Sequence, residues 1–139
     1  MGEVFPRVGS AAIVVDGDRI LLGVRAKEPN KGKWVIPGGK VRAFESYQDA
    51  AAREIREETG LEIKVEGLLG VFEIVRPPDE HRLIVYSWAH LISGELKASD
   101  DIAEARFFTR AEVVELAAHG HCSNFVVDVL VEAGWCQRQ

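Results

Sequence analysis

The stretch that decides the fold is GKVRAFESYQDAAAREIREETGL, residues 39–61. Its larger part, residues 45–59, has the composition of a helix and contains three consecutive alanines. Gly60 follows directly, at the position where helices commonly end in the left-handed conformation that glycine adopts without strain. The stretch therefore predicts a short loop followed by one helix of about four turns.

Three carboxylates gather on one side of this predicted helix. At about 100° per residue, Glu54, Glu57 and Glu58 share an arc of about 100°. Arg53 precedes Glu57 by four residues and can hold its carboxylate. The apolar wall beside them, which can dock on a sheet, consists of Ala51, Ala52 and Ile55. Because like charges this close repel one another, the helix presents either a solvated acidic face or a site for a hard divalent cation.

The same stretch resembles the signature of the Nudix hydrolase family, G-x5-E-x7-R-E-U-x-E-E-x-G-U, in which U is aliphatic. The residues at its nine fixed positions are Gly39, Glu45, Arg53, Glu54, Ile55, Glu57, Glu58, Gly60 and Leu61. The lead-in at residues 32–38 and the Phe107-Phe108 pair are also similar to the family, so the resemblance covers nearly the whole chain. It implies a metal-dependent enzyme that hydrolyses the diphosphate linkage of a nucleotide derivative.

The resemblance implies that the three carboxylates bind metal. Glu54, Glu57 and Glu58 would be catalytic ligands of one or more Mg²⁺ ions, for which Mn²⁺ can substitute. The carbonyl of Gly38 would help to hold the metal. Metal ions neutralise phosphoryl oxygens and lower the pKa of a bound water, so the reaction needs no covalent enzyme intermediate.

Other residues of the stretch would have supporting roles. Arg53, counted among the catalytic residues, and Glu45 would fix the loop against the helix. Gly39 and Gly60 would be structural glycines. In this family an acid outside the signature often serves as a ligand or base, and either Glu54 or such an acid would accept the proton. The candidates in this chain, which a plain solvated loop explains equally well, are Asp100, Asp101 and Glu104, with Glu73 a weaker one.

A basic segment precedes the acidic helix. Residues 25–42 contain six lysines and arginines and one acid, Glu28, so they carry +5, and the net charge of −5 leaves −10 for the rest of the chain. This segment is either a solvated loop or an attractor for substrate phosphates. The candidate phosphate-binding side chains are Arg25, Lys33 and Lys40.

Strands predominate in the rest of the chain. They are predicted at residues 8–15, 19–24, 34–36, 61–65, 68–75, 82–92 and 105–108. Asp16-Gly17 joins the first two as a hairpin, and Pro37-Gly38-Gly39 ends the third. Bulky residues on both faces of residues 82–92 indicate a central strand that is covered on both sides.

Two further helices are predicted near the C-terminus. Thr109 and Glu112 suit a capping box that opens a helix through Ala118, and residues 124–133 have apolar positions at helical spacing. The fold class is therefore α/β or α+β, one domain over residues 1–139 with a mixed sheet between helices. This is the arrangement that the Nudix resemblance implies.

Composition excludes several other classes of protein. The chain of 139 residues, 47% hydrophobic and 28% charged, suits one globular domain. It contains neither a membrane-spanning run nor the pattern of a signal peptide. The net charge of −5 argues against a nucleic acid duplex as partner. Cys122 and Cys136 are expected to be reduced thiols, which indicates a cytoplasmic protein.

The expected partner is a small nucleotide substrate. The chain resembles compact ADP-ribose pyrophosphatases, in which a proline about sixteen residues past the signature is a marker. Pro77 stands sixteen residues after Leu61, although a plain turn also explains it. The alternative is a MutT-like nucleoside triphosphate pyrophosphatase that acts on oxidised or non-standard nucleotides. A non-catalytic nucleotide-binding regulatory module is a third reading, and Trp135 and Val131 are candidate contacts of a homodimer.

Overall fold

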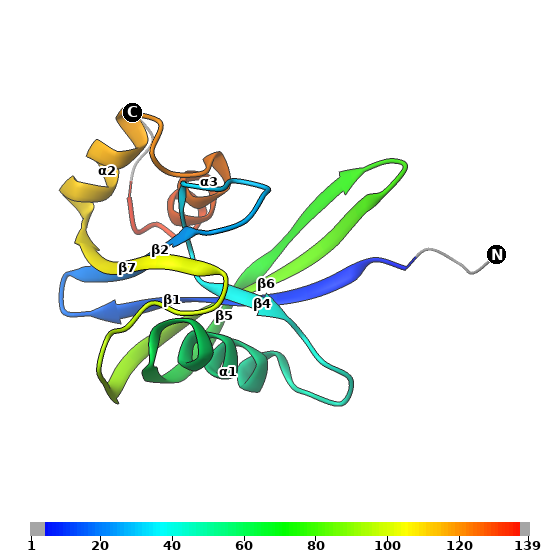
Figure 1. The fold of residues 1–139 in the computed structure, drawn as a ribbon, viewed down its shortest axis with the longest axis horizontal. Helices are drawn as coiled ribbons and strands as arrows, with labels where there is room; N and C mark the ends of the chain where they lie inside the picture. The colour runs from blue at the N-terminus through cyan, green and yellow to red at the C-terminus, as the bar shows by residue number, and fades with distance from the viewer. Residues whose placement is uncertain (1–4, 137–139) are drawn as a thin grey trace.

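The computed structural model describes residues 5–136 and arranges them as a sheet between helices (Figure 1). In chain order the elements are β1 (Arg7–Asp16), β2 (Arg19–Arg25), β3 (Trp34–Val35), β4 (Gly38–Lys40), α1 (Tyr47–Thr59), β5 (Leu61–Arg76), β6 (Glu80–Gly94), β7 (Ile102–Thr109), α2 (Arg110–Ala118) and α3 (Asn124–Glu132). None of the described helices is long and apolar enough to cross a membrane.

The sheet contains seven strands in a mixed arrangement. Its main path has the order β3-β2-β1-β6-β5, while β4 pairs with β1 and β7 pairs with β2. β1 and β6 run parallel, and all the other pairs are antiparallel. α1 covers one face of the sheet, and α2 and α3 cover the other (Figure 1). The predicted mixed sheet between helices is therefore confirmed.

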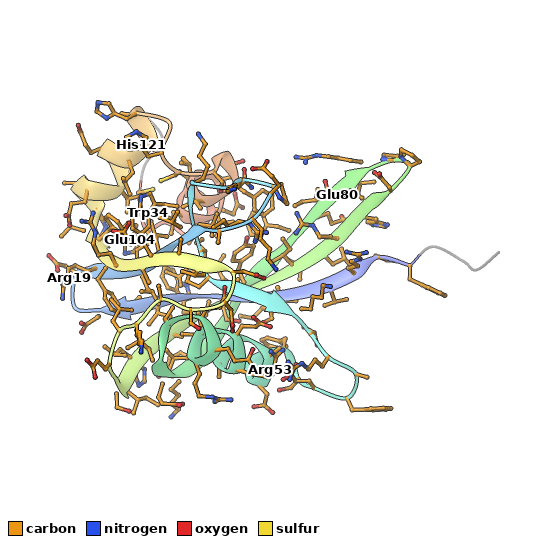
Figure 2. The ribbon with its side chains drawn as sticks, in the orientation of Figure 1. Arg19, Trp34, Arg53, Glu80, Glu104 and His121 are labelled. Atoms are coloured by element: carbon orange, nitrogen blue, oxygen red, sulfur yellow. The ribbon has the colours of Figure 1, made fainter. Side chains whose placement is uncertain are left out.

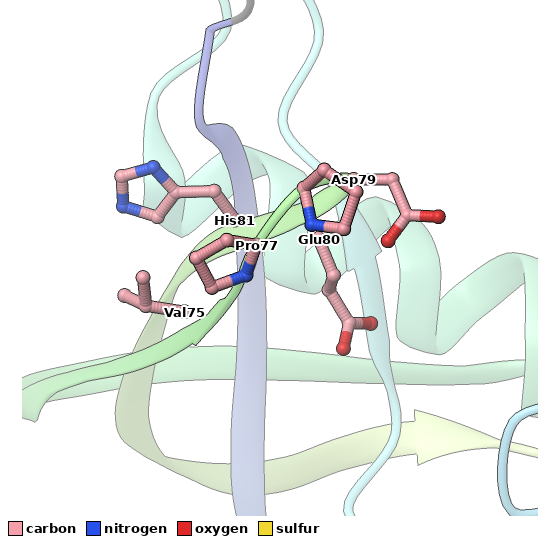
Figure 3. Close-up of a pocket in the computed structure, with 6 residues that line it drawn as sticks. Val75, Pro77, Asp79, Glu80 and His81 are labelled. Atoms are coloured by element: carbon pink, nitrogen blue, oxygen red, sulfur yellow. The ribbon is translucent and has the colours of Figure 1, made fainter.

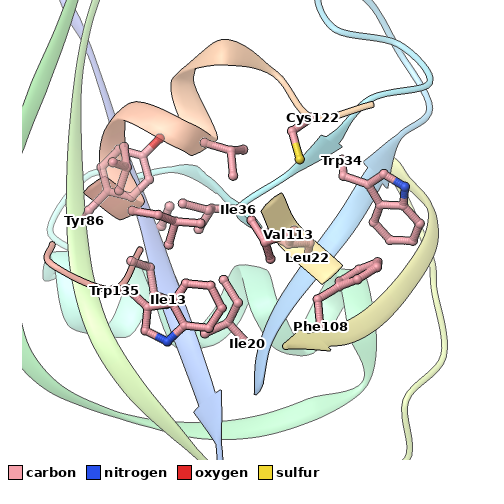
Figure 4. Close-up of a cluster of buried hydrophobic side chains, with 14 residues drawn as sticks. Ile13, Ile20, Leu22, Trp34, Ile36, Tyr86, Phe108, Val113, Cys122 and Trp135 are labelled. Atoms are coloured by element: carbon pink, nitrogen blue, oxygen red, sulfur yellow. The ribbon is translucent and has the colours of Figure 1, made fainter. Parts of the chain in front are cut away.

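Two apolar layers join the sheet to its helices. On the side of α2 and α3, the core includes Ile13, Ile20, Leu22, Tyr86, Phe108, Val113, Val129 and Leu130 (Figure 4). On the side of α1, it includes Ala12, Val14, Leu21, Ala51, Ile55, Ile63 and Ala89. Consecutive residues of β1 alternate between the two layers because side chains of a strand point to opposite faces. The predicted apolar wall of the helix does dock on the sheet, which turns its acidic side toward β4.

The glycine turn before the acidic helix is part of the sheet. The predicted hairpin of β1 and β2 is confirmed, with Val15 opposite Ile20. A strand ends before Pro37-Gly38-Gly39 as predicted, but Gly38 also begins a further strand that was not predicted, β4, which pairs antiparallel with β1. A Cβ atom on Gly38 would overlap the backbone and side chain of Ala11. Glycine at this position therefore permits a pairing that sequence patterns do not reveal.

The strands predicted at residues 61–65 and 68–75 are one continuous strand, β5. It pairs with β6 along its whole length, with three shifts of register, of which one follows Glu62 and the other two lie at Gly67 and Gly70. β6 is an interior strand as predicted, but burial on both sides is confined to its middle, at Tyr86, Ser87 and Ala89. Glu104, predicted to lie in a loop, belongs to β7 and stands opposite Val24.

The helix of the signature begins two residues later than predicted. Ser46 is its N-cap, and its hydroxyl accepts a hydrogen bond of 3.0 Å from the N–H of Asp49. Glu45 consequently stays in the loop. At the other end Gly60 adopts φ +75° as predicted, and its N–H donates to the carbonyl of Arg56. The loop and the helix therefore meet at Ser46.

The C-terminal helices close the opposite face. The capping box of Thr109 and Glu112 is confirmed, and α3 ends at Glu132, one residue before the predicted end. Trp135 is only 7% exposed and lies under the guanidinium of Arg110, 5.0 Å from the centre of its ring. Because it belongs to the core, the suggestion of Trp135 as a dimer contact was wrong. Cys122 is a buried free thiol, as predicted.

Candidate active site

Arg53 lies on α1 (Figure 2) and connects the loop before this helix to two carboxylates on the helix. The residue is 8% exposed. Its Nε and Nη2 donate to the carboxylate of Glu45 at 2.7 and 3.0 Å. Its Nη1 donates to Glu54 at 2.8 Å and to Glu57 at 3.2 Å. Nη2 also donates to the carbonyl of Lys40 at 2.9 Å, so one buried guanidinium joins three carboxylates to the end of β4.

Glu45 fixes the loop at its other end. One of its carboxylate oxygens also accepts a hydrogen bond of 3.0 Å from the backbone N–H of Arg42. The hydrogen bonds from Arg53 and then from Arg42 lower the pKa of Glu45 to about 2. Two donors therefore hold this carboxylate in its charged form between the loop and α1.

The absence of a side chain at Gly39 leaves the space that the carboxylate of Glu54 occupies. A Cβ atom built on Gly39 would overlap all three atoms of the Glu54 carboxyl group. The carboxylate of Glu54 thus lies directly against the backbone of β4, in space that only a glycine leaves open. Arg53 holds it there through Oε1.

Glu58 is the most deeply buried of the three carboxylates. It is 4% exposed, and its Oε1 has no hydrogen-bond partner among the described atoms. Burial raises the pKa of Glu58 to about 8, and the negative charges of Glu54 and Asp101 add to this effect. A backbone hydrogen bond from Gly38 and the charge of Arg25 act in the opposite direction. Both effects are smaller than the causes that raise the pKa of this carboxyl group.

The chemistry of these side chains fits a hard divalent cation. Oxygen atoms are the ligands that Mg²⁺ and Mn²⁺ prefer, and a bound cation would give the unpaired oxygen of Glu58 an interaction partner. In their present positions, however, no three acidic, histidine or cysteine side chains of residues 5–136 converge closely enough to hold an ion. Arg53 donates instead to one oxygen each of Glu54 and Glu57. Glu57 is half-exposed and can rotate away from Arg53.

The three candidate acids outside the signature have different surroundings in the structure. Asp101 forms an ion pair of 2.8 Å with Lys27, and its charge is one of the causes that raise the pKa of Glu58. Asp100 occupies the adjacent turn with φ +55°. Glu104 lies on β7. Asp101 is therefore the acid coupled most directly to the carboxylate helix.

Lys27 is a residue of the site that sequence reasoning did not single out. Lys27 forms an ion pair with the side chain of Asp101. In addition, the backbone N–H of the preceding residue, Ala26, donates to the Asp101 carbonyl at 2.8 Å. The only signal in the sequence was the membership of Lys27 in the basic segment. Its partner is more than seventy positions away in the sequence, so only the pairing of β2 with β7 brings the two together.

The three candidate phosphate-binding side chains have different surroundings. Arg25 donates through Nε to the carbonyls of Lys27 and Pro29, and its charge reaches Glu58. The charge of Lys40 lowers the pKa of Asp101, after the larger effects of Lys27 and Arg25. Lys33 instead donates to the carbonyl of Gly120 in the turn between α2 and α3. Arg25 and Lys40 thus act on the acidic site, and Lys33 is engaged elsewhere.

Comparison with known proteins agrees with this arrangement. The family model of the NUDIX domain matches residues 5–125. An ADP-ribose pyrophosphatase of Methanocaldococcus jannaschii is 42% identical over 113 residues, which are 81% of this chain and 67% of that protein. An uncharacterized Nudix hydrolase of Bacillus subtilis is 40% identical over 82 residues, 59% of this chain and 48% of that protein. The matched part of the chain thus spans about half to two thirds of the length of these relatives.

Solved structures give the same result. The crystal structure of a MutT Nudix hydrolase from Burkholderia pseudomallei superposes with a TM-score of 0.78 at 30% sequence identity, covering 93% of this chain and 98% of that one. The chain belongs to the Nudix hydrolase family. It is an enzyme of the class that hydrolyses pyrophosphate linkages.

Proposed function

We propose that this chain hydrolyses ADP-ribose to AMP and ribose 5-phosphate, with Mg²⁺ as its metal and Mn²⁺ as a substitute. The observation that carries the reaction class is the acidic side of α1, where Glu54 lies on Gly39 and Glu58 keeps a buried, unpaired oxygen. The substrate is supported by the 42% identity to an ADP-ribose pyrophosphatase. The intact signature argues against a purely regulatory module.

Some residues of the site would bind the metal, and others would orient these ligands, accept a proton or attract the diphosphate. Glu54, Glu57 and Glu58 would hold the metal, which when bound neutralises phosphoryl oxygens and activates water. Arg53 keeps Glu54 oriented through its hydrogen bond of 2.8 Å. Either Glu54 or Asp101 would accept the proton of the attacking water, because a general base must be a carboxylate near the metal ligands and the charges of both lie near Glu58. Arg25 and Lys40 supply positive charge for the diphosphate.

A panel of substrates with product analysis tests this proposal. The panel contains ADP-ribose, dinucleoside polyphosphates, and canonical and oxidised nucleoside triphosphates, each with Mg²⁺. Release of AMP and ribose 5-phosphate, with ADP-ribose the preferred substrate by kcat/KM, is the expected result. Glu57→Gln is expected to abolish hydrolysis while the fold persists. Turnover by this variant at the wild-type rate would show that the site is assigned wrongly.

A second candidate is a nucleoside triphosphate pyrophosphatase. It is favoured by the likeness to the MutT protein of Burkholderia pseudomallei, whose length the chain covers almost entirely. The same panel separates the two, because this activity releases inorganic pyrophosphate and a nucleoside monophosphate. Preference for an oxidised triphosphate would replace the ADP-ribose assignment without affecting the site.

The proposed setting is the cytoplasm, with a small nucleotide as the partner. Cys122 is a buried free thiol, which suits a reducing compartment. The net charge of −5 favours a small substrate drawn in by a local basic segment over a nucleic acid duplex.

A further inference from the structure

The face of the sheet away from α1 carries a row of residues that crosses four strands. Lys40 of β4 is paired with Gly9 of β1, and Gly9 is paired with Ile84 of β6. Phe72 of β5, which is paired with Ile84, completes the row. Directly paired residues point to the same face of a sheet, and Ile84 and Phe72 pack against the core on the side of α2 and α3. We call Lys40, Gly9, Ile84 and Phe72 the β4–β5 row.

One end of the row adjoins the carboxylates of α1. At Gly39, the residue before Lys40, the carboxylate of Glu54 occupies the place of a side chain on the opposite face. Among the described strands β4 pairs with β1 alone, so no further strand lies along its outer edge. A substrate whose diphosphate lies at these carboxylates can therefore continue past this edge onto the β4–β5 row.

The other end of the row is aromatic. The ring centre of Phe72 lies 5.4 Å from that of Tyr86 and 5.8 Å from that of Phe125, near the start of α3. Phe72 and Phe125 are only half-buried, so part of each ring stays accessible. Rings of this kind bind nucleobases by stacking. Because neighbouring strands lie about 4.8 Å apart, the row is about 14 Å long, which lets one nucleotide reach from β4 to these rings.

Two arginines stand beside the middle of the row. Arg7 of β1 and Arg82 of β6 are paired with each other and point to the same face, two residues away from Gly9 and Ile84. That spacing is about 7 Å along a strand. The charge of Arg82 also reaches Tyr86, where it opposes the burial that raises the pKa of the phenol. Both arginines therefore lie next to the position that the ribose of such a nucleotide takes.

Arg82 has a donor that the protein does not use. Its Nε is buried and has no hydrogen-bond partner among the described atoms. Its Nη2 forms an ion pair with Glu80 at 3.4 Å. A buried donor without an acceptor costs free energy, and a bound anion would remove that cost. The side chain as a whole is 35% exposed, so a ligand on this face can reach the guanidinium.

The surroundings of Arg82 are positively charged. Arg76 is paired with Glu80 on the same face, and its ion pair with Glu80, at 3.1 Å, is closer than that of Arg82. Figure 3 shows the side chain of Glu80 on the side of the hairpin away from Val75 and His81. With the two arginines beside the row, the strands present three arginines and one glutamate here, a net charge of +2 in a chain of −5. This part of the face therefore attracts anions.

We propose that the nucleoside half of the substrate lies along the β4–β5 row and that Arg82, together with Arg7, binds a further phosphate group on its ribose. The substrate class is a nucleotide with a diphosphate linkage at the 5′ position and a phosphate at the 2′ or 3′ position. The diphosphate lies at the carboxylates of α1 and does not need these arginines. This inference rests on the proposed function for the place of the diphosphate, and it extends the substrate from ADP-ribose to its phosphorylated forms.

Calorimetric titration of the full chain in Mg²⁺ with AMP, adenosine 2′,5′-bisphosphate and adenosine 3′,5′-bisphosphate tests the proposal. One of the bisphosphates is expected to bind about tenfold more tightly than AMP, as one added charge-assisted hydrogen bond supplies. Arg82→Gln is expected to abolish this gain and to leave the affinity for AMP unchanged. The matched control is Arg19→Gln, which also removes an arginine that forms one ion pair, with Asp16 at 3.6 Å, but in the hairpin of β1 and β2.

Three outcomes would overturn the proposal: no bisphosphate that binds more tightly than AMP, a gain that persists in Arg82→Gln, or an equal loss of the gain in Arg19→Gln. Thermal melting of each variant verifies folding, and little change is expected at these partly exposed side chains. The titrations do not depend on turnover, so this proposal and the assignment of ADP-ribose as a substrate succeed or fail separately.

Discussion

Gly39 and Glu54 are fifteen residues apart in the sequence and touch in the fold. The contact exists because β4 pairs with β1 while α1 packs on the same sheet. The side chain of Glu54 on α1 therefore packs against the backbone of Gly39. Arg53, the residue before Glu54 on the helix, holds this carboxylate in place through a hydrogen bond. At the scale of single residues, the site depends on one absent side chain and one guanidinium.

Replacement of Gly39 by alanine is expected to reduce kcat/KM by about a hundredfold, because a methyl group would displace the carboxylate of Glu54 by about an ångström. Steady-state kinetics measure the effect. The matched control is Gly67→Ala, where an added Cβ meets no atom within 4 Å and activity should persist. Equal activity of Gly39→Ala and the wild type would contradict the close contact of Gly39 with Glu54.

Two elements meet at the start of the acidic helix, and Glu45 joins them. Because Ser46 caps α1, Glu45 remains outside the helix and can bond both Arg42 in the loop and Arg53 on the helix. A helix beginning at Glu45, as the composition suggests, would direct this side chain differently. The position of the cap therefore decides the geometry of the loop.

The contribution of Glu45 to stability is expected to depend on pH. Its pKa is lowered on folding from an ordinary value of 4.5 to about 2, so the folded state prefers the charged form. The stabilisation is fully present above about pH 4.5 and is lost as the pH falls toward 2. Urea unfolding of wild type and Glu45→Gln should therefore show a difference that is largest near neutral pH and shrinks on acidification.

The control for this measurement is Glu95→Gln, which neutralises an exposed carboxylate outside the site. Its difference from the wild type should stay small at every pH. A difference between wild type and Glu45→Gln that grows as the pH falls would contradict the lowered pKa of Glu45.

At the scale of the whole molecule, the sheet brings the acidic side of α1 together with the turn before β7. Lys27 and Asp101 belong to segments that meet only because β2 pairs with β7. The same layering buries Glu58 among like charges. Folding thus places a carboxylate where it is costly without a cation, and metal binding should be coupled to global stability.

Mg²⁺ is expected to raise the melting temperature of the chain by about 5 °C at a concentration well above its dissociation constant, because it binds only the folded state. Differential scanning calorimetry with and without the metal measures this, and a chelator should reverse it. In Glu58→Gln the shift should largely disappear, since the buried oxygen ligand loses its charge. An undiminished shift in that variant would place the metal elsewhere.

The sequence by itself determined the local features whose physics is local. Residues three or four apart on a helix share a side, so the arc of Glu54, Glu57 and Glu58 follows from spacing alone. The same holds for the glycine at the end of α1, the hairpin of β1 and β2, and the capping box at Thr109. These predictions needed only backbone geometry and short-range hydrogen bonds.

The tertiary structure alone decided which distant groups meet. It converted the glycine turn into β4, joined two predicted strands into β5, brought the charge of Asp101 close to Glu58 and turned Lys33 to Gly120. It also buried Trp135 and left one carboxylate oxygen of Glu58, Oε1, without a hydrogen-bond partner among the described atoms. The physical reason is that burial and long-range pairing depend on how whole layers pack, and no local pattern of residues encodes that packing.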